Sequence, residues 1–178
     1  MTHLHSMTIP TPLGEMLAIA SDQGLCLLEF AGQNRLEREV AQVRKARGAA
    51  EVPGQTPILA QTRAQLAEYF AGQRQGFDVA LDLVGTDFQQ RVWQALLRIP
   101  FGQTWSYAQE AQALGQPSAV RAVANANGQN KISIIVPCHR VIGSNGTLTG
   151  YGGGLPRKQA LLALEAGQHD RLRDFCLN

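Results

Sequence analysis

Residues 136–142, VPCHRVI, place a cysteine between a proline and two residues that can carry positive charge. The thiolate is the nucleophilic form of cysteine, and a neighbouring His or Arg favours it. Cys138, followed by His139 and Arg140, therefore has the surroundings of an activated nucleophile. The competing interpretation is that Cys138 is a small buried hydrophobe, because the apolar run 132–136 leads directly into it. The elements that position these residues must decide between the two.

The composition indicates a globular protein without a membrane span. The 178 residues are 44% hydrophobic and 17% charged, which suits one large domain or two small ones. The net charge of +2 neither requires nor excludes a nucleic-acid partner. The first residues lack a basic segment followed by an apolar core, and no apolar run approaches the roughly 20 residues that cross a bilayer.

The three cysteines, Cys26, Cys138 and Cys176, lie far apart and form no C-x-x-C pattern. They predict neither a disulfide framework nor a zinc ribbon, and they indicate a reducing compartment, so we expect a cytoplasmic protein. His3 and His5 could join Cys26 around a metal, but the amino-terminal half offers no fourth soft ligand. We therefore expect no metal site.

The first half of the chain alternates strands and helices. Residues 13–20 and 25–30 predict a hairpin around the turn SDQG, and 77–83, FDVALDL, alternates as a strand does. Between them, 34–48 predicts one helix, and a second begins at Thr56–Pro57 and closes near Gly72. We expect residues 1–85 to form one domain.

The second half, residues 86–178, reads mainly as helices. Thr86 and Gln89 have the spacing of a capping box, and the helix they open stops at Pro100. Helices over 106–114 and from Pro117 onward follow, joined by a short turn with Gly115, which is the helix-turn-helix pattern. The run 132–136 predicts a strand, 143–154 is a glycine-rich loop, and a last helix runs from Pro156 to Gly167.

The second helix of that pair, SAVRAVANANG, carries one long side chain, Arg121. A helix that reads bases in the major groove presents several polar side chains, and this one does not. Small residues instead allow the backbone to approach phosphates or a minor groove, where one Arg could enter the base stack. The alternative is a buried Ala-rich helix with Arg121 at its edge.

Four segments, SYAQEA, VRAVANANGQN, ISIIVPCHRVIGSNGTLTGYGGG and RKQALLALEAG, stand in this order, with Asn130 eight and Tyr107 thirty-one residues before Cys138. Together they resemble the O6-alkylguanine-DNA alkyltransferases, or methylated-DNA–protein-cysteine methyltransferases. The likeness runs from GTDFQQRVW to LEAG and is looser in the first half, through TPLGEMLAIASDQGL and LAEYFAGQ. It implies a ribonuclease H-like α/β amino-terminal domain with a small antiparallel sheet and helices, and a mainly α, winged-helix-like carboxy-terminal domain.

The resemblance implies that Cys138 accepts an alkyl group from O6 of guanine in DNA and is spent after one transfer. O4 of thymine stays open as a second target. His139 would take the thiol proton through a water, Glu165 would hold the imidazole, and Asn130 would brace the turn before the cysteine. Tyr107 would donate a hydrogen bond or proton to the departing guanine.

The implied pocket receives a flipped nucleotide. The backbone N–H of Gly152 would face O6, and the carbonyls of Cys138 and Val141 would accept from the exocyclic amine. Tyr151 and Asn127 complete the expected pocket residues.

The implied partner is double-stranded DNA containing O6-alkylguanine, bound by a monomer through the minor groove with little sequence preference. Arg121 would fill the space of the flipped nucleotide. No cofactor or membrane is implied. The expected DNA contacts are Arg121, Ala122, Ala124, Ser144 and Lys158.

Two features depart from the family pattern. Ala124 and Asn125 add bulk where many relatives have Gly or Ala pairs, and Gly152 stands where some have serine, which should admit larger alkyl groups. Two other functional classes remain open from the residues alone. One is a helix-turn-helix transcription factor with a structural cysteine, and the other is a cysteine hydrolase built on Cys138, His139 and Glu165.

Overall fold

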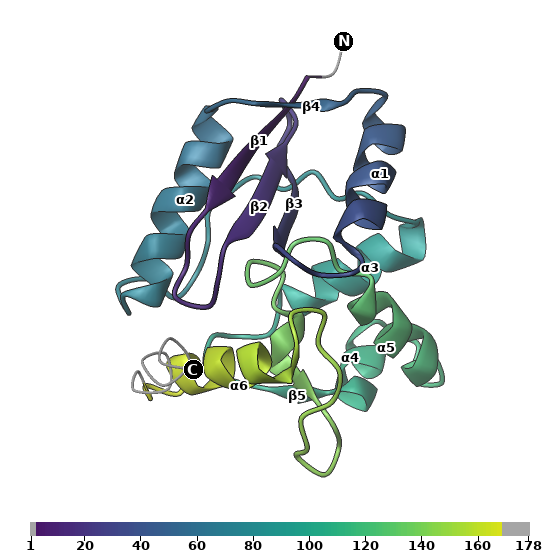
Figure 1. The fold of residues 1–178 in the computed structure, drawn as a ribbon. Helices are drawn as coiled ribbons and strands as arrows, with labels where there is room; N and C mark the ends of the chain where they lie inside the picture. The colour runs from purple at the N-terminus through teal and green to yellow at the C-terminus, as the bar shows by residue number, and fades with distance from the viewer. Residues whose placement is uncertain (1–2, 169–178) are drawn as a thin grey trace. The chain divides into compact units, whose positions relative to one another are not determined.

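The computed structural model describes residues 3–168, and the chain divides into two compact units at Val84–Gly85. The first unit holds a four-stranded sheet of order β3-β2-β1-β4 and two helices (Figure 1). Their bounds are β1 Leu4–Ile9, β2 Met16–Ala20, β3 Leu25–Phe30, α1 Leu36–Arg47, β4 Glu51–Pro53 and α2 Pro57–Phe70. β1, β2 and β3 pair antiparallel, whereas β4 runs parallel to β1. The expected small sheet is therefore present, antiparallel over β1–β3, and the parallel strand β4 makes it mixed.

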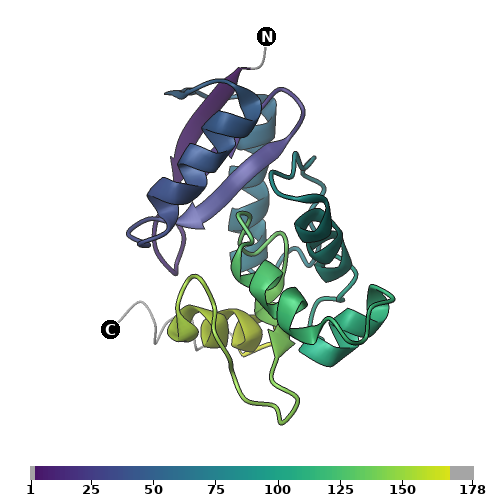
Figure 2. The ribbon, with the colours of Figure 1, turned by 90° about the vertical axis from the view of Figure 1, so that its right-hand side faces the viewer.

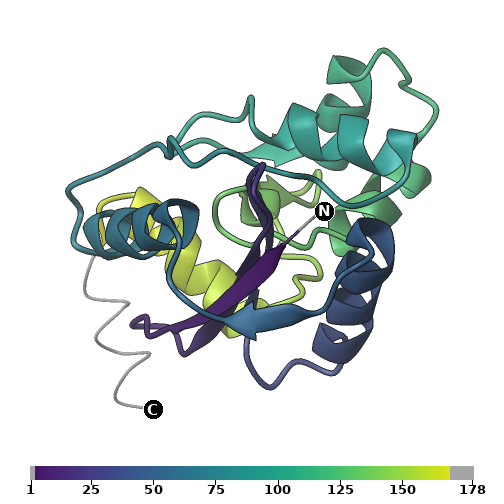
Figure 3. The ribbon, with the colours of Figure 1, turned by 90° about the horizontal axis from the view of Figure 1, so that it is seen from above.

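The two helices of this unit cover opposite faces of the sheet, α1 against β3 and α2 against β1 and β2 (Figures 1 and 3). All six residues of β3 are buried, and α1 packs against this strand. On the α1 side, Leu4, Ile19 and Leu27 pack with Val40 and Val43. The α1 side of the core thus joins residues of β1, β2 and β3 to the apolar face of α1.

The predicted helix boundaries of this unit are confirmed at their caps. The hydroxyl of Thr56 accepts a hydrogen bond from the Leu59 N–H at 3.2 Å, and Pro57 occupies the first turn of α2. α1 ends at Gly48, whose φ of 64° is left-handed and suits glycine.

Two predictions about strands in this unit fail. β1 was not predicted, although its pairing from His5↔Ala20 to Ile9↔Met16 places it at the centre of the sheet. Residues 77–83 do not form a strand. They meet β3 at one parallel bridge, Leu25↔Leu81, and the Asp82 carboxylate lies 3.6 Å from the Cys26 sulfur. Their alternation reflects an extended segment with one buried side, which produces the same pattern as a strand.

The second unit is mainly helical (Figures 1 and 2). Its elements are α3 Asp87–Leu96, β5 Trp105–Ser106, α4 Tyr107–Ala113, α5 Val120–Gly128, the 3-10 turn η1 Cys138–Arg140, β6 Val141–Ile142 and α6 Leu155–Glu165. The capping box predicted at Thr86–Gln89 is present, and Ser106 and Gln109 form a second one at the start of α4. α5 packs against α3 and α4, and it begins at Val120 rather than at Pro117.

The apolar run 132–136 is a series of turns and not the predicted strand. Its side chains are apolar because they are buried, and a short buried run has the same composition in either conformation. Ile134 adopts a φ of 72°, which is unusual for a β-branched residue and marks a strained backbone. Within residues 3–168, no helix combines the length and apolarity needed to span a membrane.

Candidate active site

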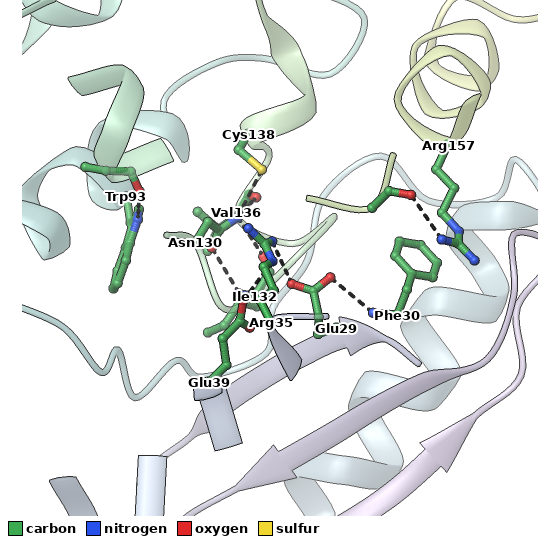
Figure 4. Close-up of polar contacts among 12 residues, drawn as sticks. Glu29, Phe30, Arg35, Glu39, Trp93, Asn130, Ile132, Val136, Cys138 and Arg157 are labelled. Atoms are coloured by element: carbon green, nitrogen blue, oxygen red, sulfur yellow. Dashed lines mark hydrogen bonds and ion pairs between the residues drawn. The ribbon is translucent and has the colours of Figure 1, made fainter. Parts of the chain in front are cut away.

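Asn130 organises the turns that lead to the cysteine (Figure 4). Its Nδ2 donates to the carbonyl of Val136 at 2.9 Å, and its Oδ1 accepts from the N–H of Ile132 at 3.0 Å. A buried amide that closes both ends of a turn replaces the ladder bonds that a strand would have supplied. This contact also supplies the reason why residues 132–136 can bend with Ile134 in a left-handed conformation.

The same amide reaches the cysteine sulfur. Nδ2 of Asn130 lies 3.2 Å from Sγ of Cys138, which starts η1 and is half-buried. An N–H donor directed at sulfur favours the thiolate over the thiol. Cys138 therefore does not have the fully enclosed packing expected of a structural cysteine, and its sulfur has a donor that a nucleophilic thiolate needs.

His139 and Glu165 form a buried pair behind the cysteine. Nε2 of His139 and Oε2 of Glu165 lie 2.7 Å apart, and the His139 side chain is fully enclosed. In the neutral imidazole, donation from Nε2 to the carboxylate leaves the ring's lone pair on Nδ1. Nδ1 makes no hydrogen bond to another described residue. The imidazole of His139 thus has the geometry of a general base whose orientation is fixed by the Glu165 carboxylate.

Arg140 completes this cluster, a role that was not predicted. Its Nε donates to Oε1 of Glu165 at 2.7 Å, and its Nη1 donates to the carbonyl of Ile99 at 2.7 Å. Burial raises the pKa of Glu165, but His139 and Arg140 lower it more, so the carboxyl has a pKa well below its ordinary value. The sequence signal was available, because Glu165 shares the inward face of α6 with Leu161.

A pocket of about 370 Å³ opens beside Cys138, within the size range of small-molecule sites. Its lining brings together five of the expected site residues that are far apart in the sequence: Tyr107, Asn127, Cys138, Tyr151 and Gly152. The remaining lining residues are Ala124, Gly128 and Gly150.

Two pocket residues are fixed by further contacts. The hydroxyl of Tyr107 lies 2.6 Å from Oγ1 of Thr149, which orients the phenol. The rings of His139 and Tyr151 meet edge to face, with centroids 6.5 Å apart. The pocket wall and the buried base are thus packed against each other.

The placement of Lys158 departs from expectation, and it involves the carbonyl of Val141. The side chain of Val141 is buried and does not line the pocket, and its carbonyl accepts from Nζ of Lys158 at 2.7 Å. Lys158 is fully buried and also donates to the carbonyl of Thr149 at 2.9 Å. It cannot meet a phosphate from that position. Its ammonium instead joins α6 to β6 and to the glycine-rich loop.

The other expected DNA contacts lie as follows. Arg121 and Ala122 on α5 are exposed, as is Ser144 in the loop, whereas Ala124 is half-buried in the pocket wall. Arg121 makes no hydrogen bond or ion pair to another described residue. α5 is held from beneath by Nε1 of Trp93, which donates to the carbonyl of Ala126 at 2.9 Å (Figure 4).

The helix pair α4–α5 has the helix-turn-helix arrangement found in DNA-binding proteins, and Cys138 lines the pocket beside it. Two family models match this chain: the 6-O-methylguanine DNA methyltransferase ribonuclease-like domain over residues 4–83, and the DNA-binding domain of the same family over residues 87–167. The chain belongs to the 6-O-methylguanine DNA methyltransferase family.

The relatives agree with this assignment. A methylated-DNA–protein-cysteine methyltransferase of Mycobacterium tuberculosis is 66% identical over 101 residues, which are 57% of this chain and 61% of the relative. One of Mycobacterium leprae is 45% identical over 165 residues, covering 93% of this chain and 94% of the relative. The crystal structure of the M. tuberculosis protein OGT in complex with DNA is similar, with a TM-score of 0.78 and 46% identity over 97% of this chain and 99% of that one.

Proposed function

We propose that this protein repairs DNA by direct reversal, moving an alkyl group from O6 of guanine to Sγ of Cys138. The observation that carries the proposal is the position of Cys138, half-buried at the pocket with the Asn130 amide 3.2 Å from its sulfur. The carbon–oxygen bond to O6 breaks as the carbon–sulfur bond forms. The resulting thioether is not hydrolysed, so each chain acts once.

Proton transfer follows from the buried pair. The thiol proton leaves to Nδ1 of His139, by way of a water, and Glu165 stabilises the imidazolium that results. The departing guanine gains a proton or a hydrogen bond from the hydroxyl of Tyr107, which faces the same pocket. The backbone N–H of Gly152 donates a hydrogen bond to O6 of the guanine, and the carbonyl of Cys138 accepts one from the exocyclic amine. The Val141 carbonyl, which accepts from the Lys158 ammonium, keeps a second lone pair for the exocyclic amine.

The target atom is out of reach inside a duplex, so the nucleotide must leave the stack. The exposed Arg121 on α5 fills the space left behind, while Ala122 and Ser144 allow close approach of the backbone in the minor groove. Binding is then largely independent of sequence. We further propose that the protein acts as a monomer in the cytoplasm, in keeping with its cysteine spacing.

Mapping the modified residue tests the proposal. The protein is incubated with a duplex containing O6-methylguanine, digested, and its cysteine peptides are analysed by mass spectrometry. We expect one methyl group on the Cys138 peptide and none after Cys138→Ser, whereas Cys26→Ser should leave the transfer unchanged. A methyl group on Cys26, or transfer that survives Cys138→Ser, would overturn the assignment.

A further inference from the structure

A buried carboxyl that the proposed chemistry does not use lies behind one wall of the pocket. Glu110 on α4 is fully enclosed, and its Oε2 accepts from Nδ2 of Asn127 at 2.7 Å. Asn127 stands in the last turn of α5 and lines the pocket together with Tyr107 and Cys138. Glu110 therefore contacts a pocket residue without reaching the pocket itself.

The Glu110–Asn127 pair contains two buried oxygens that lack a hydrogen-bond donor within residues 3–168. Oε1 of Glu110 and Oδ1 of Asn127 are both buried, and neither has a hydrogen-bond partner among the described residues. An ionised carboxylate and an amide oxygen can only accept, so neither can satisfy the other. A proton on Oε1 changes this, because the acid can then donate to Oδ1 while Oε2 still accepts from Nδ2. Both orphaned atoms are satisfied by that one proton.

The surroundings favour the protonated acid. Burial raises the pKa of Glu110 to about 7, although the hydrogen bond from Asn127 lowers it. Glu110 is the one charged residue within α4, and the packed strands β5 and β6 carry none. The charged side chains of α3 and α5, which are Asp87, Arg91 and Arg121, are exposed, and none of them perturbs Glu110.

We propose that Glu110 is a positioning residue, which in its protonated form fixes the amide of Asn127 through two parallel hydrogen bonds and so sets one wall of the alkylguanine pocket. This role rests on the proposed function, since it assumes that the pocket receives the alkylated base. Loss of the proton replaces one hydrogen bond by the repulsion of two acceptors. Asn127 then loses its fixed orientation, and the pocket wall loosens.

The variant Glu110→Gln separates this role from simple packing. A glutamine amide can donate to Oδ1 and accept from Nδ2, so it keeps both hydrogen bonds but has no proton to lose. Single-turnover transfer from the free base O6-benzylguanine is measured for wild type and variant from pH 6 to pH 9. Relative to Glu110→Gln, wild type should match at pH 6 and fall behind as the pH rises past about 7. Glu110→Leu removes both hydrogen bonds, so its transfer rate should be roughly tenfold below that of Glu110→Gln at every pH.

A second readout tests the proton directly. The infrared difference spectrum between wild type and Glu110→Gln at pH 6 should contain the carbonyl band of one neutral carboxylic acid, which disappears at high pH. Glu39→Gln, another buried glutamate, is the matched control and should leave that band in place. An ionised Glu110 at pH 6 would overturn the acid–amide pair. Identical pH profiles for wild type and Glu110→Gln would overturn the positioning role. Absence of transfer by wild type at any pH would instead overturn the proposed function and the role with it, while the infrared band still decides the pair.

Discussion

Cys138 and His139, the two residues to which we assign the chemistry, are each held by a neighbouring side chain at hydrogen-bond distance. Asn130 meets the Cys138 sulfur at 3.2 Å, and Glu165 meets the His139 imidazole at 2.7 Å. The type and spacing of these residues predicted that they would act together. The cost of holding them was not visible in the sequence, because the left-handed backbone of Ile134 depends on turns that only the folded chain creates.

At the residue scale, the Glu165 pair predicts a pH dependence of stability. The folded-state pKa of Glu165 lies below its ordinary value of 4.5. Its contribution is therefore complete above about pH 4.5 and is lost as the pH falls further through the lower folded-state pKa. Glu165→Gln should reduce the free energy of unfolding at pH 7 by about 3–5 kcal/mol, as expected for one half of a buried ion pair.

Urea unfolding of wild type and Glu165→Gln at pH 7 and at pH 3.5 or below measures this effect, and the difference between the two proteins should shrink at the acid end. Glu37→Gln on the first turn of α1 is an exposed control that should change little. A difference that grows on acidification would contradict the ionised state of Glu165.

At the element scale, helices were predicted better than strands. Helix ends are set by local bonds, such as the capping boxes of Thr86 and Ser106, and local bonds can be recognised in the sequence. Strand pairing depends on distant partners, so β1 was missed and 77–83 was misassigned. The inward direction of Lys158 was likewise missed, although its spacing from Leu161 and Glu165 places all three on one face of α6.

Lys158 gives an element-scale prediction about the glycine-rich loop. Lys158→Met keeps the aliphatic stem but removes the two bonds to the carbonyls of Val141 and Thr149. Backbone amides of residues 143–154 should then exchange hydrogen faster, and transfer from free O6-benzylguanine should slow. The affinity for unmodified DNA and its salt dependence should stay the same, as for the exposed control Lys45→Met. A reduced salt slope specific to Lys158→Met would restore the phosphate contact that we reject.

α5 gives a second prediction at this scale. Arg121→Ala should slow repair of duplex O6-alkylguanine by roughly ten- to a thousandfold, because unstacking costs a few kcal/mol that the variant cannot offset. Transfer from the free base needs no extrusion and should be nearly unchanged. Arg91→Ala on α3 is an exposed control. Equal losses on both substrates, measured as single-turnover rates, would return Arg121 to the edge of an ordinary packed helix.

At the scale of the whole molecule, the order of motifs predicted the family, and both family models confirm it. The transcription-factor and hydrolase alternatives are not favoured, since the relatives are methyltransferases that use a protein cysteine. The candidate site residues could be named from the sequence because they lie in a few short segments, and the structure brings several of them to one pocket. The acid–amide pair of Glu110 and Asn127 could not, since each residue alone is an ordinary polar residue of a helix.

The stoichiometry of repair tests the central claim most directly. A limiting amount of protein is incubated with excess duplex containing O6-methylguanine, and the intact mass of the protein and the guanine restored in the DNA are followed together. We predict that each chain gains one methyl group, that one guanine is restored for each chain, and that both values then stay constant. Restoration of more guanines than there are chains, or restoration without a gain in protein mass, would contradict irreversible transfer to Cys138.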